Sequence, residues 1–222
     1  MNDEDFEIFL EEFGEPTNHI QATDQQIEAY RDILPAQLLK YWQQVGFSGF
    51  KDGLFWFTNP AEFEDVIELF LEGTEFSDYD NYYVIARNAY GELYLWGERT
   101  GVSLEIVPAL NLIVTEKGDE NKISQGAADT AIRRFFGFQE PDDVDIEAEL
   151  KPLFPSVLKK YGSVGKDEVM VFTPYLFMGG KKSVDNMSKE NLHIFLQVMA
   201  ELGGAEIIDM ASMVKNVVKH YS

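Results

Sequence analysis

The stretch of residues 81–101 constrains the fold of this chain more than any other. It holds two short runs rich in aromatic and branched residues, 82–87 and 92–97. Between them lies Asn-Ala-Tyr-Gly, which places Asn88 at the first and Gly91 at the fourth position of a predicted type I turn. Two such runs around a turn predict an antiparallel β-hairpin.

Both faces of this predicted hairpin are apolar. In the second run, Leu93 and Leu95 would lie on one face and Trp96 on the other. A hairpin with one face in water would instead alternate apolar and polar residues. We therefore expect the hairpin to lie at the centre of a sheet that is covered on both sides.

Helical patterns flank the hairpin along the chain. In the first half, apolar residues recur at helical spacing and stop at a glycine in segments 3–13, 35–45 and 60–72. In the second half, the same pattern predicts helices that begin near Ser124 and Ser188, and a final helix over 207–218.

These patterns predict an α+β fold with two parts. Residues 1–118 would form a central antiparallel sheet packed by helices, with further strands at 53–58, 103–107 and 110–115. Residues 119–222 would form a smaller, mainly helical C-terminal domain. The boundary lies in a polar, glycine-containing segment at 117–122, and a change in charge near Lys151 gives a second candidate boundary.

The charge of the chain is strongly negative and unevenly distributed. The net charge is −21; residues 1–150 hold 32 acidic against 9 basic residues, and residues 151–222 hold 7 against 9. Such a chain repels a phosphate backbone, so we expect no direct nucleic-acid binding. The charge can serve solubility alone, or it can form a face that captures a basic protein partner.

The N-terminus and the apolar content suggest a cytoplasmic protein. The first ten residues lack the basic start and apolar run of a signal peptide, and no 18-residue apolar run could cross a membrane. The chain has no cysteine, which excludes thiol catalysis and agrees with a reducing compartment.

Residues that carry chemistry do not group into a known motif. The histidines, His19, His193 and His220, are not at metal-ligand spacing. The segment 179–183 (GGKKS) lacks the spacing of a phosphate loop, and there is no nucleophile elbow. We therefore expect no enzyme activity and no catalytic, metal-binding or cofactor-binding residues.

The hairpin and its neighbours resemble a known family. Residues 86–101 (ARNAYGELYLWGERTG), 34–47 and 53–67 resemble the GAD-like domain and, more widely, a superfamily of bacterial toxin-immunity domains. Residues 153–174 and 190–204 are similar to a short domain that often follows GAD-like domains. That two-part arrangement is typical of immunity proteins encoded beside type VI secreted DNase effectors.

The resemblance implies a protein that neutralises a toxin by binding it. The expected partner is a cognate toxin, a nuclease, held in a stoichiometric complex in the cytoplasm. The family's name also leaves open an accessory docking module related to tRNA-charging machinery. A carboxylate-based hydrolase is a third hypothesis, since acidic residues are abundant.

The acidic stretch 68–80 is the predicted partner-binding region. It begins on the acidic outer face of the helix predicted over 60–72, continues into the segment after it, and contains no basic residue. Nearby tyrosines could anchor a partner, or they could pack against the sheet. The predicted partner-binding residues are Glu68, Glu72, Glu75, Asp78, Tyr79, Asp80, Tyr82 and Tyr90.

Overall fold

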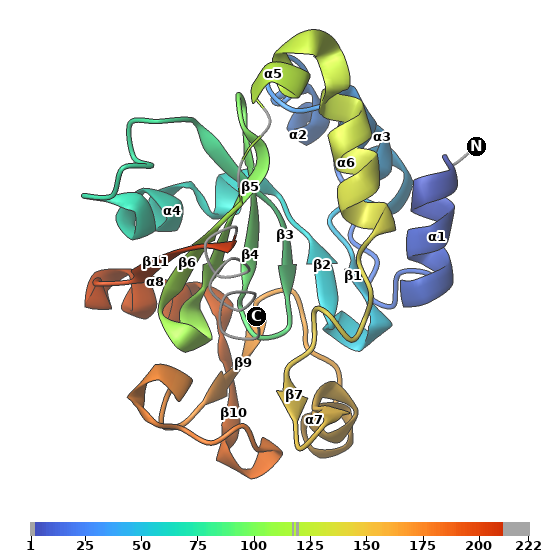
Figure 1. Ribbon diagram of the computed structural model, residues 1–222. Helices are drawn as coiled ribbons and strands as arrows, with labels where there is room; N and C mark the ends of the chain where they lie inside the picture. The colour runs from blue at the N-terminus through green and yellow to red at the C-terminus, as the bar shows by residue number, and fades with distance from the viewer. Residues whose placement is uncertain (1–2, 117, 119, 211–222) are drawn as a thin grey trace, which may run out of the picture.

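A seven-stranded sheet forms the centre of the protein. The computed structural model describes residues 3–116, 118 and 120–210. The sheet has the order β1-β2-β3-β4-β5-β6-β11, and all neighbours are antiparallel except β6 and β11, which are parallel (Figure 1). Its strands are β1 (Gly49–Phe50), β2 (Phe55–Phe57), β3 (Tyr82–Asn88), β4 (Leu93–Gly97), β5 (Gly101–Val107), β6 (Leu112–Thr115) and β11 (Glu206–Asp209).

The predicted hairpin is confirmed as β3 and β4, in the middle of this sheet. Tyr83 pairs with Trp96, and every residue of β4 is buried. In the turn, the Gly91 N–H donates to the Asn88 carbonyl at 3.3 Å, and Gly91 has a φ of 81°. An L-residue is strained at that φ, so glycine suits this position.

Helices cover both faces of the sheet, as expected for the hairpin. Figure 1 shows α1, α3 and α6 on one side of the sheet and α4 and α8 on the other. The helices are α1 (Glu4–Phe13), α2 (Asp24–Glu28), α3 (Ala36–Val45), α4 (Glu64–Leu71), α5 (Glu120–Lys122), α6 (Ala128–Gly137), α7 (Phe154–Tyr161) and α8 (Leu192–Leu202).

Each face of the sheet has its own apolar core. The core beneath α1, α3 and α6 is rich in aromatic residues and includes Phe9, Trp42 and Trp96. The core beneath α4 and α8 is mainly aliphatic and includes Leu93 and Leu95 of the hairpin. The two faces of β4 therefore enter different cores, which is why neither face carries polar residues.

Both cores combine residues from before and after residue 118. Phe57 stacks on Phe136 with ring centroids 4.4 Å apart, and α4 packs against α8. Strand β11 also joins the sheet from the far end of the chain. The two segments are thus one packed body in space, and the boundary at residue 118 stays a prediction about sequence modules.

The C-terminal segment contains more strand than its sequence pattern predicts. The helix expected from Ser188 begins only at Leu192, where the Asn191 side chain accepts a hydrogen bond from the Ile194 N–H at 3.0 Å. The residues before it form β10, which pairs with β9. The small strands are β7 (Glu147–Ala148), β8 (Lys151–Pro152), β9 (Glu168–Phe172) and β10 (Met187–Asn191).

The helix predicted over 207–218 is wrong at its start. Ile207 and Ile208 lie in β11, because the edge of β6 offers backbone hydrogen bonds that a sequence pattern cannot show. The rest of that predicted helix, from residue 211 onward, lies outside the described residues.

Candidate partner-binding surface

The acidic face of α4 follows from the amphipathic pattern of the helix. Ile67 and Phe70 are buried in the aliphatic core, so the residues between them point to solvent. Glu68 and Glu72 are both exposed there. They stand four positions apart and therefore lie on one side of the helix.

The loop after α4 extends the acidic surface. The Thr74 side chain stabilises the first turn of this loop. Its hydroxyl donates a hydrogen bond to the Leu71 carbonyl at 2.7 Å and accepts one from the Phe76 N–H at 3.2 Å. Glu75 and Asp78 are exposed beyond this turn. The structure thus exposes four of the predicted carboxylates, Glu68, Glu72, Glu75 and Asp78, along α4 and the loop that follows it.

Asp80 has a structural role at the end of the loop. Its carboxylate accepts hydrogen bonds from the Thr100 N–H at 2.9 Å, the Thr100 hydroxyl at 2.8 Å and the Arg99 N–H at 3.0 Å. These bonds fasten the acidic loop to the turn between β4 and β5. Asp80 therefore positions the surface, and its charge is partly used within the protein.

Tyr79 is exposed but already has neighbours. Its side chain is 47% exposed, and its hydroxyl donates to Glu120, which raises the pKa of the tyrosine. The Arg99 guanidinium lies over its ring, 4.9 Å from the centroid. Sequence reasoning missed both contacts, because Arg99 and Glu120 lie 20 and 41 positions away.

Tyr82 and Tyr90 differ in accessibility. Tyr82 is half-buried, and burial raises its pKa to about 12. Tyr90 is only 2% exposed, and its hydroxyl donates to Asp145 at 2.5 Å. A side chain this buried has little area to offer a partner of the folded protein. Tyr90 therefore contributes little to the exposed acidic surface.

An acidic cleft of about 980 Å³ lies beside the loop. Three predicted residues line it, Glu75, Tyr79 and Tyr82, together with Glu116 and other carboxylates. In the part of the chain that the structure describes, its lining holds four carboxylates and neither lysine nor arginine. The full set of acidic lining residues is Glu75, Glu116, Glu120 and Asp209.

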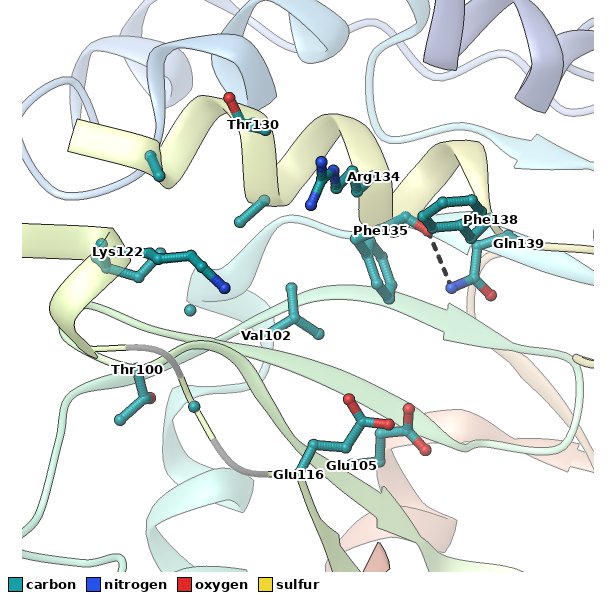
Figure 2. A pocket seen from close by; sticks show the side chains of 15 residues that line it. Thr100, Val102, Glu105, Glu116, Lys122, Thr130, Arg134, Phe135, Phe138 and Gln139 are labelled. Carbon is teal, nitrogen blue, oxygen red and sulfur yellow. Dashed lines mark hydrogen bonds between the residues drawn. The ribbon is translucent and has the colours of Figure 1, made fainter. Parts of the chain in front are cut away.

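A second cleft, of about 510 Å³, lies between α6 and β5 (Figure 2). It shares Glu116 with the acidic cleft. Figure 2 shows the Glu116 and Glu105 carboxylates side by side on one wall, with Arg134 on the opposite wall. Burial, and then the charge of Glu116, raise the pKa of Glu105 to about 7.

The carboxylate pair of the second cleft is suited to holding a proton or a basic group. A raised pKa lets Glu105 exchange a proton near neutral pH, which general acid–base chemistry requires. The rest of the lining combines apolar side chains, two basic ones, Lys122 and Arg134, and the uncharged polar residues Thr100, Thr130 and Gln139. The pair alone defines no reaction.

The described residues form neither a candidate metal site nor a membrane-spanning helix. Residues 3–116, 118 and 120–210 contain no group of three metal-ligating side chains that could hold a metal ion. Over the same residues, no helix is both long and apolar enough to cross a membrane.

Comparison with known proteins agrees with the resemblance in the sequence. A family model of the GAD-like domain matches residues 4–110. A second model, of the C-terminal domain of the type VI secretion system (T6SS) immunity protein Tdi1, matches residues 129–203. No curated protein sequence matches the chain.

A solved structure shares the fold. The crystal structure of Atu4351 from Agrobacterium tumefaciens is similar with a TM-score of 0.77 and 20% sequence identity, and the similarity covers 92% of each chain. At this identity, the likeness shows a common architecture across both segments of the chain.

The two matches, in this order along the chain, are those of a two-part immunity protein of the type VI secretion system. Within that class, this chain joins a GAD-like N-terminal domain to the C-terminal domain of the Tdi1 immunity proteins.

Proposed function

We propose that this protein binds a DNase toxin of the type VI secretion system in the cytoplasm and blocks it in a one-to-one complex. The match of residues 129–203 to an immunity-protein domain carries this proposal. An inhibitor of this kind acts by occupying a surface of the toxin and needs no chemistry of its own.

The acidic surface supports a nuclease as the partner. An enzyme that holds DNA presents lysine and arginine to the phosphate backbone, and an inhibitor with the opposite charge meets that face rapidly. Glu72, Glu75 and Asp78 are exposed on one stretch of chain, next to a cleft lined by further carboxylates. Rapid association is an advantage when the toxin acts inside the same cell.

A titration of nuclease activity tests the proposal. The toxin encoded beside this gene is held at a fixed concentration, well above the dissociation constant, and the immunity protein is added in steps. We expect DNA cleavage to fall linearly and to stop near one equivalent. A toxin that keeps full activity in the presence of excess protein would contradict the proposal, and cleavage of a non-nucleic-acid substrate would contradict the DNase assignment.

A further inference from the structure

A groove of about 310 Å³ lies where α4, α8 and β11 come together. We call it the α4–β11 groove. Its walls come from the end of α4, the end of α8 and the edge of the sheet. Its main apolar lining residues are Leu69, Phe70, Ile113, Met199 and Ile207.

Three glycines at the ends of α4 and α8 line this groove. They are Gly73, Gly203 and Gly204, and a Cβ atom at any of them would meet no described heavy atom within 4 Å. The ends of α4 and α8 therefore leave space that no described side chain fills. An apolar side chain from a partner could enter this space without displacing the protein's own atoms.

Large apolar side chains are exposed at the rim of the groove. Leu69 is 39% exposed, Ile207 is 41% exposed, and Leu202, adjacent to the groove residue Gly203, is 51% exposed. A group of exposed apolar residues around a groove is typical of an interaction site. Such residues become binding hot spots when a partner removes them from water.

Acidic residues surround the same groove. Glu72 lines it, Glu68 and Glu75 are exposed beside it on α4 and the following loop, and Glu206 is exposed on β11. Among the described residues that line the groove, there is no lysine or arginine. The described lining thus joins apolar residues to the polar Thr74 and Asn111, and its charged side chain, Glu72, is acidic.

We infer that the α4–β11 groove receives an apolar side chain from a toxin segment that carries lysine or arginine on either side of it. The negative charge at the rim favours this occupant, because Glu68, Glu72 and Glu75 attract a basic segment and repel an acidic one. The inference rests on the proposed toxin binding. An apolar side chain in this groove would anchor the toxin, which charges alone do not do. Charges at the rim mainly set the association rate, and buried apolar contacts mainly set the dissociation rate.

The first test replaces Leu69 by serine and follows binding of the toxin by surface-based kinetics. We expect Leu69→Ser to speed dissociation by about tenfold or more and to leave association within about twofold. Ile8→Ser is the matched control. Ile8 is 41% exposed, and it lies on α1, on the opposite side of the molecule from α4 (Figure 1).

Ile207→Ser is a second variant that keeps the test valid if Leu69→Ser folds poorly, because Ile207 also lines the groove and is 41% exposed. Wild-type dissociation rates in both folded groove variants would overturn the inference, and the titration of nuclease activity would still support toxin binding. A dimer of the free protein that either variant dissociates would also overturn it, by assigning the groove to a second copy. A wild-type protein that fails to bind the toxin would overturn both the inference and the proposed function.

Discussion

The guanidinium of Arg87 lies over the indole ring of Trp56, 5.0 Å from the ring centroid. Arg87 is in β3 and is almost fully buried. The same guanidinium donates to the carbonyls of Gly165 at 3.0 Å and Lys166 at 2.6 Å. One buried side chain therefore ties the central hairpin to the segment that precedes β9.

We predict that Arg87→Met destabilises the whole protein. Methionine approximates the volume but cannot donate to the two carbonyls or interact with Trp56 as a cation. Loss of such a buried network costs about 2–4 kcal/mol of unfolding free energy. Denaturant unfolding measures this cost, with Arg31→Met as the control, because the ion pair of Arg31 with Glu28 is on the surface. Equal stability of the two variants would show that the buried contacts of Arg87 contribute little.

A second prediction separates structure from binding at Tyr90. Its hydroxyl bonds to Asp145, and the same carboxylate accepts from the Phe154 N–H at 2.8 Å and the Ile146 N–H at 2.7 Å. Tyr90→Phe removes one bond of this network, so we expect a loss of about 1–2 kcal/mol in stability. Toxin affinity should not change, because the residue is buried. A Tyr90→Phe variant with wild-type stability but weaker toxin binding would contradict this prediction and show that Tyr90 contacts the partner.

A third prediction concerns the pH dependence of stability. Burial, and then the charge of Glu105, raise the pKa of Glu92 from its ordinary value of 4.5 to about 8. The folded state thus holds a proton that the unfolded state releases between these two values, so this group lowers stability as pH rises from about 4.5 to 8. We expect Glu92→Gln to raise the melting temperature at pH 8.5 and to leave it nearly unchanged at pH 4.

The control for this pH effect is Glu7→Gln on α1. Glu7 is exposed, so Glu7→Gln makes the same chemical replacement at the surface without relieving a buried carboxyl group. The difference in melting temperature between the two variants, measured across pH 4 to 9, isolates the effect of Glu92. A pH-independent difference would contradict the raised pKa.

Local patterns were sufficient to predict the central hairpin and most helices of the first half. Strand β4 enters two cores, so its apolar pattern is visible in the sequence itself. Strand β11 could not be predicted in this way. It pairs with β6, and Glu206 lies opposite Leu112 across an interval of more than ninety residues. A short apolar run such as Ile207-Ile208 fits a helix or a strand until its partner is known.

The candidate surface was predictable only where it depends on the local sequence. The exposure of Glu68 and Glu72 follows from the amphipathic pattern of α4. The hydrogen bond of Tyr90 joins it to Asp145, 55 positions away, and the contact of Tyr79 with Arg99 depends on the register of β3 and β4, which sets Tyr82 opposite Gly97. The α4–β11 groove depends on three elements that meet only in the folded protein.

The most direct test of toxin binding at the acidic surface is the association rate of a charge-reversed protein. The triple variant Glu72→Lys, Glu75→Lys and Asp78→Lys is compared with a control of equal charge change on α1, at Glu7, Glu11 and Glu12. These control residues are also exposed, on the far side of the molecule (Figure 1).

Stopped-flow mixing with the toxin at low and high salt gives the deciding measurement. We expect the acidic-surface variant to associate about tenfold or more slowly than the α1 control at low ionic strength, with a difference that shrinks as salt screens the charges. Equal association rates for the two variants at low ionic strength would contradict toxin binding at this surface.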